Sequence, residues 1–138
     1  MRTLLRHQAL LALISPLVLP ITSALALDLN SFRAQHGRPA LSYSAGLAGL
    51  AYQQANAMAG RGRIDHRDFR ARIGASIGST HAENVSYGCA DEDCAIRQWA
   101  RSGGHRNNML RGDVSAYGIA SAVGDNGRKY WALELGGE

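Results

Sequence analysis

Apolar residues recur at helical spacing through much of the chain. The strongest pattern begins at Ser44, which is suited to cap a first turn, and stops at Gly60, so a helix is predicted between them. Its apolar stripe is formed by Leu47, Leu50, Ala51, Ala55 and Met58. Shorter helices are predicted in three further places: residues 28–37, where Asp28 is the cap, the residues around Phe69, and residues 91–103. In the last of these, acidic residues come first and arginine last, the charge order that suits the helix dipole.

Strand patterns occupy much of the remaining sequence. The segment at residues 80–88 is short and contains β-branched and aromatic side chains, which predicts an extended conformation. Residues 116–124 and 129–136 flank the turn Asp125-Asn126-Gly127, and an Asn-Gly pair between two such runs is a strong hairpin signal. Helices that come first and a hairpin that comes last predict an α+β fold.

The first 26 residues have the features of a leader that is removed on export. Two arginines precede an apolar run, and the segment closes with Ala24-Leu25-Ala26, which fits the small-x-small rule for signal peptidase. The apolar run is short for a membrane span and is broken by two prolines. We therefore predict a signal peptide at 1–26, a single domain at 27–138 with no transmembrane anchor, and a secreted or periplasmic location.

The charge of the predicted domain gives no sign of a nucleic-acid partner. Two of the 15 basic residues lie in the leader, so 13 remain against 11 acidic residues, a net charge of +2. Twelve of the 13 are arginines, and they are scattered along the chain rather than clustered as in a nucleic-acid footprint. We expect no nucleic-acid binding.

Two cysteines remain in the exported domain, Cys89 and Cys94. A close pair in an oxidising compartment most often forms a disulfide, and closing so short a loop contributes about 2 kcal/mol at best. A redox pair is the alternative, but the spacing is not C-x-x-C. Metal binding by the pair is less favoured still, because no further cysteine is present to join it.

Five segments stand in a particular order along the chain: LNSFRAQHGRPALSYSAGLAGLAYQQANAMA, HRDFRARI, AENVSYG, IRQWARSGGHRNNML, and YGIASAV with YWALELG. In this order they resemble the CAP superfamily (cysteine-rich secretory protein, antigen 5 and pathogenesis-related 1), in its bacterial SCP-like extracellular branch. Each segment alone is a weak signal, and the five together are specific. The resemblance implies an α-β-α sandwich with a cleft that holds two histidines and two acids.

The resemblance places His66, Glu83 and His105 in that cleft. Two imidazoles, a carboxylate and water would form an open site for a divalent metal such as zinc, with His66 and His105 as ligands. The three residues are 17 and 22 positions apart, so only the fold can bring them together. We expect Gly103 and Gly104 to turn His105 inward at the start of a short helix, whose dipole favours a neutral imidazole. The alternative is that histidine and glutamate bond each other and only fix the sandwich.

The second acid of the implied cleft is missing. Its position, three residues after Trp99, is occupied by Ser102, and Glu92 and Glu134 are the candidates to replace it in space. Ser102 also lies three residues before His105, but no G-x-S-x-G motif supports a serine hydrolase, and a serine at a helix end is usually a cap.

Three residues are accessory candidates for the cleft. His81 shares one strand face with Glu83 and could join it, while Ser102 and Arg106 flank His105. Asn84 would point to the other face and hold backbone through its amide. Aromatic residues on the predicted strands have two alternative roles: they would line a groove for lipid or, as is more common, belong to the core. These residues are Tyr87, Tyr117, Tyr130 and Trp131.

The missing acid favours binding over catalysis. We predict a secreted, non-enzymatic CAP-domain protein that binds a small ligand, lipid, metal or cell-envelope component in the cleft. The first alternative is a metal-dependent hydrolase or peptidase that uses the same three residues. The second is a structural or interaction domain with a vestigial cleft. Apolar walls around an open cleft would favour lipid, and a dry cluster of mutually bonded histidine and glutamate would favour the vestigial domain.

Overall fold

The computed structural model describes residues 25–74 and 80–137, so residues 1–24 of the predicted signal peptide lie outside the described part. The described residues form the helices α1 (Leu29–Gln35), α2 (Ala45–Arg61), α3 (Phe69–Ile73), α4 (Glu92–Ala100) and α5 (Gly103–Met109). They also form the strands β1 (Ser42–Tyr43), β2 (Thr80–Tyr87), β3 (Ala116–Val123) and β4 (Lys129–Gly137). No helix within these ranges is long and apolar enough to cross a membrane.

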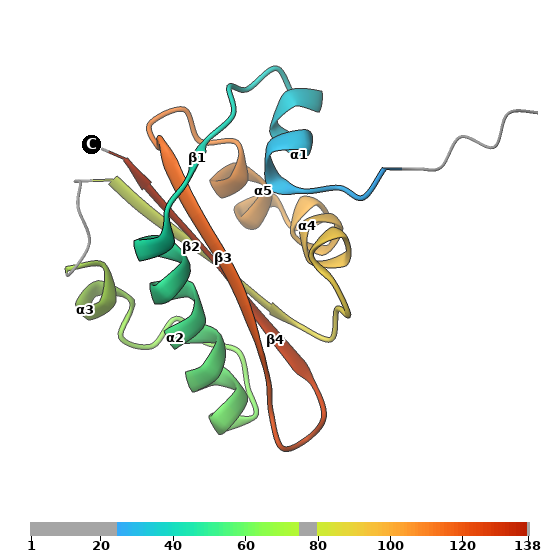
Figure 1. Cartoon of the computed structure of the whole chain (residues 1–138), viewed down its shortest axis with the longest axis vertical. Coiled ribbons are helices and arrows are strands. Elements are labelled where there is room, and N and C mark those ends of the chain that lie inside the picture. The colour runs from blue at the N-terminus through green and yellow to red at the C-terminus, as the bar shows by residue number, and fades with distance from the viewer. Residues whose placement is uncertain (1–24, 75–79, 138) are drawn as a thin grey trace, which may run out of the picture.

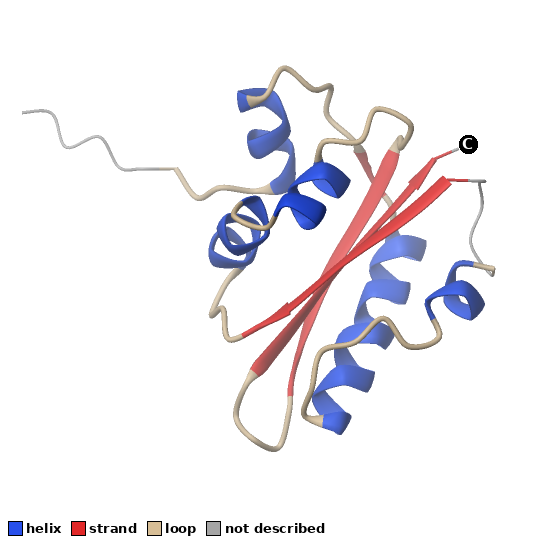
Figure 2. Cartoon of the chain, turned by 180° about the vertical axis from the view of Figure 1, so that it is seen from behind, coloured by secondary structure: helices blue, strands red, loops and turns tan. Residues whose placement is uncertain are grey.

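The four strands form one sheet in the order β1-β3-β4-β2. The short β1 runs parallel to β3, and β4 runs antiparallel to both of its neighbours. Helices α2 and α3 lie on one side of the sheet, and α1, α4 and α5 lie on the other (Figures 1 and 2). This three-layer arrangement confirms the predicted α+β sandwich.

Large apolar side chains fill the layer between the sheet and helices α1, α4 and α5. Trp99 and Ile96 of α4 are fully buried there against Leu133 and Leu135 of β4. Arg33 of α1 is buried as well, and its guanidinium donates hydrogen bonds to three backbone carbonyls, those of Pro39, Met109 and Arg111. Arg33 is the buried cation of this layer among the residues described, and these three hydrogen bonds offset the cost of burying its charge.

The layer between the sheet and α2 is built from small residues. Ala51 and Ala55 of α2 pack on Ala132 of β4. A Cβ atom at Gly118 of β3 would lie 2.0 Å from the backbone nitrogen of Ala48. The backbones of α2 and β3 therefore touch, and only glycine fits at this position.

The predicted helix and hairpin boundaries hold with two corrections, one of which is that the helix predicted for residues 91–103 ends at Ala100, before α5 begins at Gly103. The side chains of Asp28 and Ser44 cap α1 and α2 as expected. The prediction that Gly60 ends the long helix is wrong: α2 continues to Arg61, and Gly62 terminates it because it adopts the left-handed conformation (φ 66°). The predicted hairpin is confirmed, with Gly127 at φ 73° in its turn.

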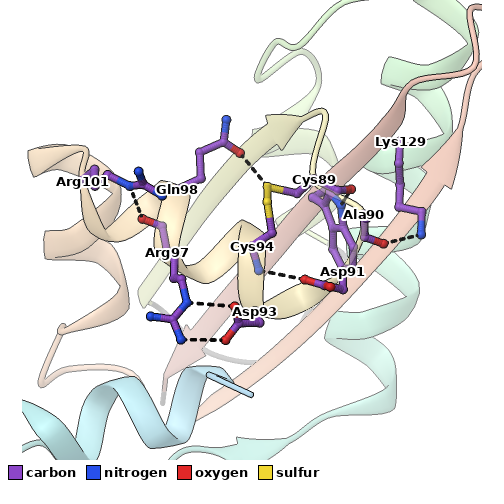
Figure 3. The surroundings of a disulfide bond; sticks show 10 residues. Cys89, Ala90, Asp91, Asp93, Cys94, Arg97, Gln98, Arg101 and Lys129 are labelled. Atoms are coloured by element: carbon purple, nitrogen blue, oxygen red, sulfur yellow. Dashed lines mark hydrogen bonds and ion pairs between the residues drawn. A yellow bond between two sulfur atoms is a disulfide. The ribbon is translucent and has the colours of Figure 1, made fainter. Parts of the chain in front are cut away.

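The predicted disulfide is also confirmed. Cys89 and Cys94 are joined with an S–S distance of 2.10 Å, which ties the end of β2 to the first turn of α4 (Figure 3). The Cys89 carbonyl accepts a hydrogen bond from the indole of Trp131. The Ala90 carbonyl accepts one from Lys129, so the bridge is anchored to β4 at two points.

Candidate functional site

A pocket of about 200 Å³ opens beside the edge strand β2. It is lined by Ile64, Asp65, His66, Val85 and His105. The two histidines that the sequence placed in one cleft therefore share one pocket. Ile64 and Val85 give this pocket an apolar wall.

The segment that carries His66 is held in place from α2. Gln54 of α2 donates a hydrogen bond from its side chain to the carbonyl of Asp65. The Asp65 carboxylate accepts two bonds from the guanidinium of Arg61, at 2.7 and 3.1 Å. Asp68 then takes a left-handed conformation (φ 58°) directly before α3. These contacts fix the position of His66 although its side chain is 55% exposed.

Glu83 is buried beneath His66 and is bound on both of its oxygens. Its Oε1 lies 2.6 Å from Nδ1 of His66, and its Oε2 accepts a hydrogen bond from the guanidinium of Arg72 on α3. The Glu83 side chain is only 1% exposed. Because Nδ1 donates to the carboxylate, Nε2 of His66 is the nitrogen left for a ligand, an arrangement that also orients metal-binding histidines.

Glu134 is the residue that lies beside Glu83. The two glutamates are register partners on β2 and β4, and Nε of Arg72 is 3.8 Å from Oε1 of Glu134. Neither Glu134 oxygen accepts a hydrogen bond from a described residue. Burial, a hydrogen bond with Glu83 and the Glu83 charge raise the pKa of Glu134 from 4.5 to about 9, against the opposing effect of Arg72. Glu134 is therefore a neutral acid near pH 7, and its proton can be donated to Glu83.

Glu92, the other candidate for the missing acid, belongs to a different region. It lies in the first turn of α4, where the backbone N–H of Leu29 bonds its carboxylate. Burial and the neighbouring charge of Asp28 raise the pKa of Glu92. Of the two candidates, only Glu134 is part of the cluster around Glu83.

Two asparagines bring His105 to the pocket. Nδ2 of Asn84 donates to the carbonyl of His105 at 2.9 Å, and Nδ2 of Asn108 donates to Oδ1 of Asn84 at 2.9 Å. Asn84 therefore holds backbone on the face opposite to Glu83, as predicted. Burial first, and then the charge of His66, lower the pKa of His105 below 6.5. Both effects favour the neutral form of the His105 imidazole.

The glycines before His105 do not have the predicted role. Gly103 and Gly104 lie inside α5 and have no left-handed φ, and His105 is the third residue of that helix. The asparagine bonds, rather than a glycine turn, set the direction of α5. Ser102 is at the cap position of α5 but makes no side-chain capping bond there.

Residues 28–135 match the sequence model of the cysteine-rich secretory protein (CAP) family. The match spans most of the chain. The chain belongs to the CAP family.

Solved structures support the CAP fold. An outer surface protein of Borrelia burgdorferi is similar with a TM-score of 0.71 at 16% identity, over 80% of this chain and 86% of that one. An extracellular SCP-domain protein of Bacillus anthracis has a TM-score of 0.68 at 22% identity, over 80% and 38% of the two chains. A cysteine-rich secretory protein of Staphylococcus aureus has a TM-score of 0.63 at 22% identity, over 78% and 35%. No curated protein sequence matches the chain.

The accessory candidates lie outside the pocket lining of this CAP domain. His81 lies on β2 opposite Gly136. Arg106 points toward α1, with a guanidinium nitrogen 3.4 Å from Nε2 of His36. Nδ1 of His36 bonds the Phe32 carbonyl at 2.8 Å, in agreement with a structural role at the end of α1.

The strand aromatics do not form one groove. Tyr130 is fully buried in the α2 layer, whereas Trp131 is buried in the opposite layer. Tyr87 is exposed beside Tyr130, and Tyr117 packs with the Trp131 layer. Their division between two faces favours the core over a shared lipid groove.

The pocket offers a metal ion fewer ligands than the sequence suggested. Within residues 25–74 and 80–137, no three His, Cys, Asp or Glu side chains converge as a metal site requires. Glu83 is already bound on both oxygens, and the Asp65 carboxylate in the lining is bound by Arg61. This leaves His66 and His105, whereas catalytic zinc sites use three protein ligands. A complete zinc centre does not fit this arrangement, and the two histidines remain a predicted pair of ligands.

Four site residues were not identified by sequence reasoning: Ile64, Asp65, Arg72 and Val85. An arginine can pair with any nearby acid, so Arg72 carried no signal until the fold placed α3 over Glu83. The alternation of side chains along a strand could have identified Val85, because it follows Glu83 by two residues and therefore lies on the same face of β2.

Proposed function

We propose that this CAP domain is exported and binds a small ligand, without turning it over, in the pocket between His66 and His105. The proposal rests mainly on one observation. The Glu83 carboxylate has His66 on one oxygen and Arg72 on the other. It is therefore an anchor for His66 rather than a free base or nucleophile.

The rest of the cluster also favours binding over catalysis. Hydrolysis by acid–base chemistry needs groups that can exchange protons with a substrate within hydrogen-bond reach. Glu134 is buried behind Glu83 and does not line the pocket, and Ser102 occupies the position of the second family acid. The polar groups in the pocket lining are the two imidazoles and the Asp65 carboxylate, which is bound by Arg61.

The pocket dimensions limit the ligand class. Pockets for drug-sized molecules are about 300–1,000 Å³, and this one is about 200 Å³. It suits a small molecule, or one polar group of a larger envelope component, with Ile64 and Val85 against its apolar part. A neutral imidazole nitrogen accepts a hydrogen bond and a protonated one donates, so the two histidines could hold either a donor or an anion.

Export is supported by the leader and by the disulfide. The leader carries the basic, apolar and small-residue regions of a signal peptide, and a disulfide persists in oxidising compartments. Two similar solved structures are named as extracellular or secretory proteins.

Titration of the protein starting at Leu27 with Zn²⁺, acetate and inorganic phosphate tests pocket binding, with the His66 and His105 imidazole resonances as readout. We expect at least one probe to shift both imidazoles saturably, and His105→Ala to abolish the effect. His81→Ala is the matched control, since His81 lies on β2 outside the pocket lining. The proposal would be overturned if no probe gave a saturable shift, or if the shifts were equal in His105→Ala and His81→Ala.

A hydrolase remains the second candidate, because His66 bonded to a buried carboxylate also has the orientation of a general base. Turnover of a fluorescent peptide library separates the two functions. Turnover that is lost in His66→Ala would establish the hydrolase, whereas binding without turnover supports our proposal.

A further inference from the structure

The chain changes from exposed to buried at one peptide bond near its beginning. Leu25 is 90% exposed and Ala26 is exposed, whereas Leu27 is 8% exposed. Leu27 and Leu29 belong to the same apolar core as Trp99. The packed domain therefore begins at Leu27, the first residue after the small-x-small motif.

The start of α4 binds the backbone of this first packed segment. The backbone nitrogen of Leu27 donates a hydrogen bond to Oδ1 of Asp93. Two residues later, the N–H of Leu29 bonds the carboxylate of Glu92. Two neighbouring acids of α4 thus hold two alternate backbone nitrogens at the beginning of the domain.

The charges around the Leu27 nitrogen are predominantly negative. Asp93 contacts it directly, Glu92 precedes Asp93 on α4, and the charge of Asp28 in the first segment acts on Glu92. Arg97 is the cation that pairs with this group, and it bonds both oxygens of Asp93 at 2.8 and 3.0 Å (Figure 3). From β3, the neutral Tyr117 phenol experiences the charges of Glu92 and Asp28. Three carboxylates against one guanidinium leave an excess of negative charge when the Leu27 nitrogen is an uncharged amide.

We propose that a signal peptidase cleaves between Ala26 and Leu27, and that the new α-ammonium group of Leu27 forms an ion pair with Asp93. Hydrolysis adds water across the peptide bond, so Ala26 leaves with a carboxylate and Leu27 keeps a protonated amine. That amine brings three N–H donors and a positive charge to the acid that the amide nitrogen already contacts. Removal of the leader therefore adds a positive charge to the carboxylates at the start of α4. The inference rests on the export part of the proposed function and is independent of ligand binding.

The cleavage position is tested on the full chain, expressed with its own first 26 residues and recovered from the periplasm or medium. We expect the intact mass of residues 27–138 with one disulfide. A different N-terminal residue on the exported protein, or recovery of the uncleaved chain alone, would overturn the assignment of this bond.

The ion pair is tested on the protein that starts at Leu27, by following the pH dependence of α-amine acylation with mass spectrometry. We expect the pKa of the amine to lie above its ordinary value of about 8, because Asp93 favours the charged form. Asp93→Asn should return the pKa to the ordinary value, and Arg97→Gln should raise it further by removing the competing cation.

Asp113→Asn is the matched control, because Asp113 pairs with Arg111 in another exposed ion pair. An amine pKa that is ordinary, and equal in all four proteins, would overturn the ion pair. If Asp93→Asn does not fold, the comparison with Arg97→Gln still decides. The assay does not involve the pocket, so its result is independent of whether His66 and His105 bind a ligand.

Discussion

The two faces of the sheet are held to their helices by different means. On the face toward α1, α4 and α5, large apolar side chains such as Trp99 and Leu133 fill the space. On the face toward α2 and α3, alanines and Gly118 let backbones touch, and Arg72 is buried with Glu83 and Glu134. The apolar face supplies cohesion, whereas the face with the charged cluster supports the histidine of the pocket.

The two means of attachment have different consequences for function. Apolar contacts are non-directional, so they fix the helices without fixing any one side chain's chemistry. Hydrogen bonds to a buried carboxylate are directional and costly to leave unmade. The charged cluster can therefore orient His66 from the less apolar face, at some expense of stability, whereas His105 reaches the pocket from α5 on the other face.

The largest expected effect is on the apolar face. Trp99→Ala removes a fully buried indole from the centre of that layer. We expect a loss of about 3–5 kcal/mol in the free energy of unfolding, measured by urea denaturation. A loss below about 1 kcal/mol would show that this layer is not the main source of cohesion.

Arg72→Met tests the charged face. It leaves Glu83 and Glu134 buried without their cation, and breaking a buried pair in this way costs about 3–5 kcal/mol. We place the loss near the lower end, since Glu134 is already protonated. In urea denaturation, the double variant Arg72→Met, Glu134→Gln should lose less free energy of unfolding than the sum of the losses in the two single variants. Strict additivity would contradict the proposed cluster.

The stability of the charged face should depend on pH through Glu134. Its pKa is raised from 4.5 to about 9, so between these values the folded state holds a proton that the unfolded state has lost. The stabilising contribution is complete below pH 4.5 and is lost as the pH rises toward 9, with a slope of up to about 1.4 kcal/mol per pH unit.

Glu134→Gln should remove this slope, because an amide does not titrate. Urea denaturation at pH 5.5 and pH 8 measures the effect, and Asp113→Asn, which changes an exposed acid whose pKa is lowered by its hydrogen bond with Arg111, is the comparison. The same pH dependence in wild type and Glu134→Gln would show that Glu134 is ionised in the folded protein.

The smallest expected effect lies within the pocket. The charge of His66 contributes to the lowered pKa of His105, after burial. His66→Gln should therefore raise the pKa of His105 slightly toward its ordinary value, because burial, the larger cause, stays in place. Titration of the His105 Cε1–H resonance measures it, and His81→Gln should leave the value unchanged. An unaltered pKa in His66→Gln would separate the two imidazoles electrostatically.

The elements of this fold were largely predictable because local chemistry decides them. Asp28 and Ser44 cap helices, Asn126-Gly127 turns a hairpin, and Cys89 and Cys94 are close enough in sequence to form a disulfide. The end of α2 was misplaced at Gly60 because two glycines compete there. Only the backbone conformation of Gly62 decides between them.

The site was less predictable because it depends on distant pairings. His66, Glu83 and His105 followed from a family resemblance, not from their spacing. Arg72 could be identified only once the fold placed it against Glu83, and the choice of Glu134 over Glu92 required the strand order that places Glu134 opposite Glu83. Register and layer assignment are properties of the assembled sheet, so no local pattern reports them.

The most direct test of the account is the tautomer of the His66 imidazole, read from long-range ¹H–¹⁵N correlations at a pH where the ring is neutral. The account predicts a proton on Nδ1, bonded to Glu83, and an unprotonated Nε2, with the Nδ1–H signal lost in Glu83→Gln. A proton on Nε2, or a spectrum that Glu83→Gln leaves unchanged, would show that Glu83 does not anchor the histidine and would contradict the central claim.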